Sequence, residues 1–482
     1  MNHRRVLHIL GLVLLILAVA QLVPVLWCLG DAESAALRGF LIGSGATAGL
    51  GLLFRLLGSA EGDLYRREGV LIVVGAWMMA SLTGSIPYFA SGIVPSVIDA
   101  LFESASGFTT TGASILTDIE GAGRALLFWR SLTQWLGGIG IVVLFVALLS
   151  ELGPGARFLF KLEVPGPKAE IMHDRVQDTA LALGRIYVGL SAALAVILLF
   201  CGLSLFDALT HTFSTLSTGG FSPHSSSVGH FGPLVQIVVL IFMLGAGVNF
   251  SLYFAALRNR NLAALRDREL QIYLGMALLS TLIIAVDVSS LVGVDGGIGR
   301  TLLDAAFQAV SILTTTGFAT ADFAVWPTFS QSLLVGLMVV GGCAGSTAGG
   351  AKIIRGMIGW RAVMREVRMT FSPNSIIAVA IDGESVPEES VRSVVALLVL
   401  WLLSWGVGTL LLSVGDHGIA TAASASVATL SNIGPGLGPV GPEGNFAFFA
   451  PWQKGVMVVL MWLGRLEFFA LLSIFQVRFW QR

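Results

Sequence analysis

Ten long apolar runs alternate with short polar connections along the chain, and they predict a bundle of membrane helices. The runs cover about residues 6–29, 36–57, 69–92, 124–150, 178–202, 230–257, 268–292, 328–361, 390–414 and 450–476. Crossing a bilayer takes about 20 apolar residues. Four shorter apolar pieces of 13 or 14 residues lie at about 96–108, 205–217, 301–314 and 418–430. A piece of that length enters the membrane without crossing it, so the backbone after it must be buried in protein or face water.

A motif rich in threonine, serine and glycine follows each short piece. Asp99, Asp207 and Asp304 each stand 13 residues before a motif glycine, and Thr421 takes this place in the fourth copy. Glycine permits backbone angles that turn a carbonyl towards an axis, and rings of such oxygens replace the water shell of a cation. One such motif is more typical of a plain loop, but four copies in the same alignment favour a cation filter. The predicted filter comprises Thr109, Thr110, Thr111, Gly112, Ser217, Thr218, Gly219, Gly220, Thr314, Thr315, Thr316, Gly317, Ser431, Asn432, Ile433 and Gly434.

The four copies predict an all-α polytopic membrane protein with four tandem repeats of helix, pore helix, filter and helix. We expect the repeats to surround a pseudo-fourfold pore, with two extra transmembrane helices at the N-terminus. The expected boundaries are 1–60 for this helix pair, then 61–160, 161–258, 259–370 and 371–482 for the repeats. The negative ends of four pore-helix dipoles would converge on the filter and favour a cation. The three aspartates are expected to be N-caps of the pore helices rather than ion ligands.

Composition and charge agree with a membrane protein. The chain is 55% apolar and 12% charged, whereas soluble proteins are about 25% charged. The net charge of −1 argues against a nucleic-acid partner. Lysine and arginine gather at Arg4–Arg5, 157–175, 258–268 and 352–368, and the segments directly after the four motifs contain none. Because positive charge stays in the cytoplasm, we expect a multi-pass protein of the cell inner (plasma) membrane with both termini cytoplasmic and the filters opening outward.

A second glycine-rich stretch interrupts the apolar run 328–361. Residues 341–350 include five glycines. Each glycine inside a helix costs about 1 kcal/mol, so a break in the helix is expected here. The alternative is close helix packing through small residues.

Polar residues inside apolar runs are further candidates. Arg465 lies in the last run, where a charge costs roughly 2.5–3.5 kcal/mol on insertion scales. We expect it to face the pore; the alternative is an ion pair with an acid of a neighbouring helix. Glu467 is a poor partner, because residues two apart on a helix point away from each other. Glu103 is expected to hydrogen-bond behind the first filter, and Asn249 to line the inner cavity.

Residues 69–476, with one filter glycine in each of four tandem repeats, resemble the Trk/Ktr/HKT superfamily of potassium transporters, and most closely its TrkH family. The extra helices at 6–57 are similar to the N-terminal addition of that family. The resemblance implies potassium as substrate, bound at the filter carbonyls. In plant relatives a serine at the first glycine accompanies sodium preference, so Gly112 favours potassium. The resemblance also implies a gate that comprises Gly341, Gly342, Gly345, Ser346, Thr347, Gly349, Gly350, Lys352 and Arg465.

The function that the resemblance implies is potassium uptake across the cell membrane, driven by a voltage worth about 2.3 kcal/mol per charge per 100 mV. It also implies a homodimer, and a cytosolic TrkA-like ring with nucleotide-binding domains that docks on the basic inner loops. The alternative is a sodium-preferring or poorly selective monovalent cation transporter of the same fold. The sequence shows neither a nucleotide-binding motif nor paired catalytic groups at membrane depth, so we expect no enzyme activity and no cofactor in this chain.

Overall fold

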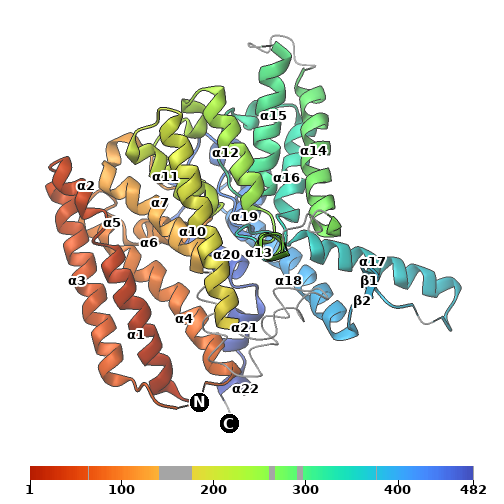
Figure 1. Ribbon diagram of the computed structural model, residues 1–482, viewed down its shortest axis with the longest axis horizontal. Coiled ribbons are helices and arrows are strands. Elements are labelled where there is room, and N and C mark those ends of the chain that lie inside the picture. The colour runs from red at the N-terminus through yellow and green to blue at the C-terminus, as the bar shows by residue number, and fades with distance from the viewer. Residues whose placement is uncertain (63, 141–175, 260–265, 290–296, 376, 481–482) are drawn as a thin grey trace.

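The computed structural model describes residues 1–482 except 63, 141–175, 260–265, 290–296, 376 and 481–482 (Figure 1). The N and C termini lie at the same end of the molecule. Three helices precede the repeats: α1 (His3–Ala20), α2 (Val25–Gly30) and α3 (Ser34–Leu57). α1 packs along α3 where two glycines meet, because a Cβ on Gly51 would lie 3.0 Å from the Gly11 carbonyl oxygen. Small residues at a crossing let membrane helices approach closely.

Four repeats follow, each with a first helix, a pore helix and a second helix. The first helices are α4 (Arg66–Gly84), α10 (Val176–Phe200), α14 (Arg268–Ser289) and α18 (Glu388–Leu412). The pore helices are α6 (Val97–Phe108), α11 (Leu205–Leu216), α15 (Gly297–Leu313) and α19 (Ile419–Leu430). The second helices begin with α7 (Arg124–Ile139), α12 (Pro233–Ala246), α16 (Thr328–Val340) and α20 (Pro451–Arg465). The pore helices coincide with the four short apolar pieces, which confirms this part of the prediction.

Further elements join or extend these helices. They are α5 (Ile86–Ala90), α13 (Phe250–Asn259), α17 (Ile353–Phe371), α21 (Phe469–Ile474), α22 (Val477–Trp480) and the hairpin of β1 (Ala380–Ile381) and β2 (Glu384–Ser385). The two strands are antiparallel, with Ala380 opposite Ser385. A 3₁₀ turn follows each filter motif, at Glu120–Ala122, Ser227–His230, Phe323–Val325 and Gly438–Val440.

The repeats are arranged in a closed ring. The second helix of each repeat packs on the pore helix of the next: α7 on α11, α12 on α15 and α16 on α19. The fourth repeat returns to the first, because α20 packs on α6. An ion pair reinforces this closure, with Lys454 Nζ of α20 2.6 Å from Asp99 Oδ1 of α6. This cyclic order confirms the predicted all-α membrane fold with four tandem repeats.

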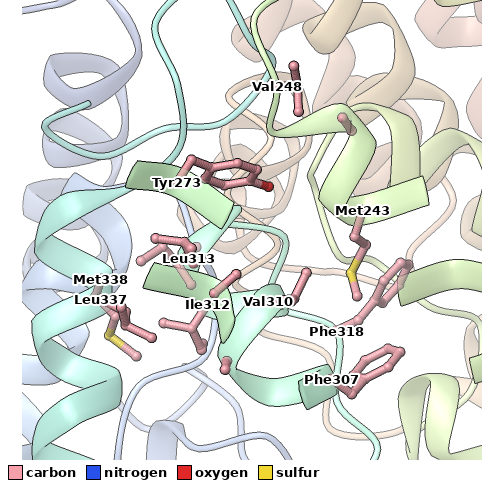
Figure 2. Close-up of a cluster of buried hydrophobic side chains, with 14 of the residues drawn as sticks. Met243, Val248, Tyr273, Phe307, Val310, Ile312, Leu313, Phe318, Leu337 and Met338 are labelled. Atoms are coloured by element: carbon pink, nitrogen blue, oxygen red, sulfur yellow. The ribbon is translucent and has the colours of Figure 1, made fainter. Parts of the chain in front are cut away.

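Apolar side chains fix each pore helix inside the ring, as α15 illustrates. Ile312 and Leu313 are fully buried at its C-terminal end. Figure 2 shows Met338 of α16 on one side of them and Met243 of α12 towards the other, where Phe318 also lies. All five side chains belong to one buried cluster that joins repeats two, three and four. The end of the pore helix, and hence the motif that follows it, is therefore held on several sides.

Two predicted runs are not continuous helices. Run 230–257 bends by 88° between α12 and α13. The glycine-rich stretch is hydrogen-bonded to this bend. The Cys343 N–H donates to the Gly247 carbonyl at 3.1 Å, and the Phe250 N–H donates to the Gly345 carbonyl at 3.0 Å. Run 450–476 breaks after Arg465.

The ten predicted apolar runs therefore do not all form single continuous helices. Among the described residues, six helical stretches are long and apolar enough to cross a membrane, or seven if the bent pair counts as one span. The break expected in run 328–361 is present between α16 and α17. The end of run 124–150 and the basic stretch 157–175 lie outside the described residues.

The expected N-cap role of the three aspartates is also wrong. Ser96 and Ser204 are the N-caps of α6 and α11, and their hydroxyls accept from the N–H groups of Asp99 and Asp207 at 3.4 and 3.0 Å. A serine three residues upstream thus takes the cap position. Asp304 lies within α15 and pairs with Arg300 at 2.7 Å. The carboxylates instead form ion pairs and hydrogen bonds that join neighbouring elements.

Candidate functional site

The four motifs share one backbone fold. In each, the N–H of the third residue donates to the carbonyl five residues earlier, at the same distance of 2.8 Å. The four donor–acceptor pairs are Thr111 and Ser106, Gly219 and Ser214, Thr316 and Ser311, and Ile433 and Ala428. Each motif therefore turns back on the end of its own pore helix in the same way, including the fourth motif, whose sequence differs most.

Left-handed backbone recurs at two positions of every motif. The second residue has φ of 55°, 53°, 55° and 55° at Thr110, Thr218, Thr315 and Asn432. The last residue, always glycine, has φ of 79° to 100° at Gly112, Gly220, Gly317 and Gly434. Positive φ is a backbone conformation that residues other than glycine rarely adopt. A threonine in this conformation costs of order 1–3 kcal/mol, and such strain clusters at functional sites.

The glycines bring the four motifs together. A Cβ on Gly434 would lie 2.8 Å from the Thr111 carbonyl oxygen and 3.0 Å from the Gly112 carbonyl carbon. The other three glycines face the next motif in the same manner: Cβ atoms on Gly112, Gly220 and Gly317 would collide with the carbonyl oxygens of Gly219, Thr316 and Ile433. The motifs thus form a closed ring of four backbones, in chain order. No side chain fits between neighbours without displacing backbone.

Amide side chains hold two of the motifs from behind. Gln134 of α7 donates to the Gly219 carbonyl at 2.6 Å and accepts from the Phe221 N–H at 3.1 Å. Asn432 of the fourth motif donates to Thr111 Oγ1 at 2.9 Å. The ring is therefore not symmetric, because Gln134 occupies one lone pair of the Gly219 carbonyl.

A buried ion pair braces the first and second motifs. Arg130 Nε of α7 lies 2.7 Å from Glu103 Oε1 of α6, and their side chains are 2% and 0% exposed. Arg130 also donates to the Ser222 carbonyl at 3.3 Å and to Ser114 Oγ at 3.1 Å. Glu103 accepts from the Ile115 N–H at 3.0 Å, as expected for a residue behind the first filter. The pair therefore connects a pore helix to the segments that leave two motifs.

The segments after the first and second motifs are also joined at their surface. The Ser225 N–H donates to Glu120 at 2.7 Å, and its hydroxyl donates to the other carboxylate oxygen. These hydrogen bonds from Ser225 lower the pKa of the Glu120 carboxyl below its ordinary value. Glu120 therefore remains ionised at neutral pH and keeps the two segments connected.

The glycine-rich segment 341–350 lies against the third and fourth motifs and the end of the second pore helix. The Gly349 N–H donates to Thr315 Oγ1 at 2.6 Å, and the Gly350 N–H to the Ser431 carbonyl at 3.1 Å. Thr347 Oγ1 donates to the Leu216 carbonyl, at the end of α11, at 3.0 Å. We call residues 341–350 the gate segment. It contacts the second, third and fourth repeats at the level where each pore helix passes into its motif.

Charged residues secure the gate segment. Arg465 is 4% exposed and donates to the carbonyls of Thr347 at 2.9 Å and of Gly137, in α7, at 3.1 Å. Glu467 pairs with Arg355. Glu269 at the start of α14 accepts from the N–H groups of Ala344 at 2.7 Å and Ile354 at 3.2 Å.

The predicted gate residues are thus close together in space. Gly341, Gly345 and Gly350 have φ of 70° to 77°, and so does the neighbouring Lys352, at 70°. Lys352 Nζ donates to the Ala348 carbonyl. Whether the motifs bind ions and whether this segment opens stay predictions, because the geometry establishes position and contacts only.

Sequence reasoning missed Arg130 and Glu269, and it noted Gln134 as a polar residue in the membrane without giving it a role. Arg130 and Gln134 stand in the apolar run 124–150, where a charged or amide group is itself a sign of function. Glu269 lies at the edge of its apolar run, where neighbouring charged residues are typical of an ordinary helix end. Asn249 lies beside Gly345, whose Cβ would be 2.8 Å from Asn249 Oδ1. Its expected place on the inner cavity stays a prediction.

Four motifs that each follow a pore helix and meet in a closed ring inside an apolar helical bundle are typical of membrane proteins that transport cations. Within the described residues, no group of three or more histidine, cysteine, aspartate or glutamate side chains is placed to hold a metal ion.

Comparison with known proteins gives the same class and a family within it. The chain matches the family described as "TrkH: Cation transport protein" over residues 48–481. It is similar to the "Trk system potassium uptake protein TrkH" of Halomonas elongata, with 39% identity over 490 residues, and of Escherichia coli (strain K12), with 36% identity over 486 residues; both comparisons cover 100% of each chain. The crystal structure of the potassium transporter TrkH from Vibrio parahaemolyticus matches with a TM-score of 0.88 and 33% identity, and covers 100% of each chain.

The chain belongs to the TrkH family of cation transport proteins, which confirms the resemblance seen in the sequence. Its relatives are components of transport systems, so the family gives no reason to expect an enzyme.

Replacing Arg130 tests the brace. Arg130→Met leaves the Glu103 carboxylate buried without its partner, and breaking such a pair costs about 3–5 kcal/mol. We expect a large fall in the thermal unfolding midpoint of the detergent-solubilised protein, and partial recovery in the double variant Glu103→Met with Arg130→Met. Arg124→Met, on the same helix, removes a charge whose side chain is 45% exposed and should cost no more than about 1 kcal/mol. Equal midpoints for Arg130→Met and Arg124→Met would contradict the account.

Proposed function

We propose that this chain carries potassium ions into the cell through the ring of four motifs. The observation that carries the proposal is the closed ring itself, in which four repeated backbone turns meet glycine against carbonyl. Relatives that align with the whole chain are potassium uptake proteins by name. Inward movement of each charge gains about 2.3 kcal/mol per 100 mV of membrane potential, so the pore itself requires no nucleotide.

The ring offers an ion three kinds of stabilisation. Carbonyl oxygens of the motifs replace water ligands, and motif hydroxyls such as those of Thr109 and Thr111, 2.7 Å apart, support the turns. The C-terminal ends of four pore helices add partial negative charge, about half an electron each. This field disfavours anions without a charged side chain in the path. All sixteen motif residues given above form the proposed potassium site.

The gate segment controls passage in this proposal. It is held by the bonds from Gly349 and Gly350 to two motifs and from Arg465 to the Thr347 carbonyl. Each such bond contributes on the order of 0.5–1.5 kcal/mol, and a bond to a charged group up to about 3. Opening requires only that a few of these hydrogen bonds break and are replaced by hydrogen bonds to water. Arg465 also places positive charge beneath the ring, which raises the barrier for a cation while the segment is closed.

The proposal includes the setting of the protein. The chain lies in the inner membrane with both termini in the cytoplasm and works as a homodimer. A TrkA-like ring with nucleotide-binding domains docks on the basic inner loops and acts on the gate segment through two helices. These are α17, which follows the segment in the chain, and α13, whose Phe250 N–H donates to the Gly345 carbonyl. The repeat boundaries at 61, 161, 259 and 371 remain part of this proposal. The bend between α12 and α13, bonded to the gate segment, offers a route from the inner surface to the ring.

A sodium-preferring or poorly selective transporter of the same fold is the second candidate. Two observations favour weaker discrimination than a symmetric filter would give. The fourth motif carries Asn432 and Ile433 in place of hydroxyl residues. The Gly219 carbonyl is bonded to Gln134.

The proposed function is tested by cation flux. Potassium-loaded vesicles that contain the purified protein should take up external rubidium when the TrkA-like partner and its nucleotide are present. Competition by potassium and by sodium separates the two candidates, because the first predicts that potassium competes far better. Absence of flux with the partner and nucleotide present would contradict transport. Equal competition would favour the second candidate.

Gly317→Ser tests the ring. Gly317 has φ of 80°, and a Cβ there would lie 2.7 Å from Pro435 Cδ and collide with the Ile433 carbonyl. The third and fourth motifs must then move apart, so potassium preference should fall, by about tenfold if the geometry of one ligand is lost at about 1.4 kcal/mol. Gly336→Ser, in the same repeat with nothing near its Cβ, should keep wild-type preference. Unchanged ion competition in Gly317→Ser would contradict the filter.

Gly345→Ala tests the gate segment. Gly345 has φ of 70°, and its Cβ would lie 2.8 Å from Asn249 Oδ1. The substitution strains the segment by about 1–3 kcal/mol and should change open probability in single-channel recordings without changing ion preference. Gly356→Ala, where nothing lies within 4 Å of the Cβ, should behave as wild type. A change of preference with unchanged open probability would assign the segment to the filter instead.

A further inference from the structure

A small pocket lined by arginines lies between α17 and the hairpin segment that follows it. The cavity is about 250 Å³ and is lined by Arg361, Met364, Arg365, Arg368, Ile377, Ala378, Val379 and Ala380. Figure 1 shows α17 running across the end of α14 and away from the body of the bundle. The pocket is therefore separate from the ring of motifs and from the gate segment.

The charge of the pocket is only partly compensated. Arg365 pairs with Glu388 at 2.7 Å and with Glu366 at 3.2 Å. Arg361 and Arg368 make no ion pair or side-chain hydrogen bond within the described part of the chain. No acidic residue lines the cavity, and the remaining lining is methionine, isoleucine, valine and alanine. Two arginines without an ion partner in the described part of the chain thus lie on a cavity whose lining, apart from Arg365, is apolar.

The arginines determine which kind of ligand the pocket can bind. Their planar N–H groups match phosphate and carboxylate oxygens in paired hydrogen bonds. Of the acids on the neighbouring elements, Glu388 of α18 faces Arg365 and Asp382 of the hairpin lies 4.0 Å from Arg268. Glu384 and Glu389 lie on the same elements but do not line the cavity. An external anion is therefore the complement that the pocket lacks.

The rest of α17 indicates where this anion comes from. An apolar stripe of Trp360, Val363, Val367 and Phe371 is exposed, with Trp360 67% and Phe371 84% exposed. Helical spacing places this stripe directly beside the stripe of Arg361, Arg365 and Arg368. A helix with aromatic and aliphatic side chains on one face and arginines on the next is typical of the lipid interface, with the apolar face in the acyl region and the arginines at the headgroups.

We propose that the Arg361–Arg365–Arg368 pocket binds the phosphate group of an anionic phospholipid, with α17 lying in the membrane interface. Basic pockets of this kind recognise anionic headgroups, and each arginine contributes a few-fold to the affinity. The hairpin closes over the headgroup, while the apolar stripe contacts the acyl chains. The site needs neither the ring nor the gate segment to function, so its test does not depend on transport.

The test is native mass spectrometry of the full-length, detergent-purified protein with added lipid. We expect dioleoylphosphatidylglycerol to bind in preference to dioleoylphosphatidylcholine. The double variant Arg361→Gln with Arg368→Gln should weaken this binding about 30-fold, which corresponds to about 1 kcal/mol for each arginine. The matched control, Arg258→Gln with Arg478→Gln, removes two exposed arginines elsewhere and should bind as wild type. Ala378→Glu, which adds a carboxylate to the lining, should weaken binding while leaving both arginines in place.

The remaining measurements distinguish a lipid headgroup from free inorganic phosphate as the ligand of the pocket. Competition by inorganic phosphate, with phosphatidylglycerol and phosphatidylcholine binding equally, would identify a soluble phosphate as the occupant and overturn the lipid assignment. Preference for phosphatidylglycerol that inorganic phosphate does not abolish supports it. Equal lipid binding by the double variant and its control overturns the proposal. So does a change in the association of protomers without a change in lipid binding, because the pocket would then belong to a contact between proteins.

Discussion

The close approach of four backbones is the constraint on which the rest of the structure depends. Each motif glycine lies so near the next motif that a single Cβ would meet its backbone. The arrangement leaves no room for a side chain and forces left-handed backbone on threonine or asparagine at the second position of every motif. Such residues are strained by about 1–3 kcal/mol each. They persist only because the surrounding bundle allows no alternative, and the ring closure of helices, from α20 back to α6, supplies that rigidity.

Polar groups in an apolar interior complete this restraint. An unpaired polar group there costs several kcal/mol, and several buried side chains find their partners in the motifs and the gate segment. Gln134 bonds to the second motif, Arg130 and Glu103 join the first to the second, and Arg465 bonds to the gate segment. The same groups that make the interior polar therefore fix the pore geometry. A cation path can exist in this bundle without any exposed ionised side chain.

The sequence was sufficient for those features that depend on local pattern. The short apolar pieces gave the pore helices to within a few residues, and the glycines at 341–350 gave the break between α16 and α17. Features that depend on distant partners were not predictable. The bend at Gly247 depends on hydrogen bonds to the gate segment, and the sequence of run 230–257 does not identify that distant partner. The aspartates were misassigned because Ser96 and Ser204, three residues upstream, compete better for the cap. The arginine pocket needs the hairpin to fold back on α17.

The most direct measurement of the central claim is the position of bound ions. Crystals or frozen samples of the protein in rubidium can be analysed for anomalous or difference density in the ring. The account predicts density on the axis enclosed by Gly112, Gly220, Gly317 and Gly434, within about 3 Å of motif carbonyl oxygens. Density only outside the ring, with the space between the four glycines empty at high rubidium, would contradict it.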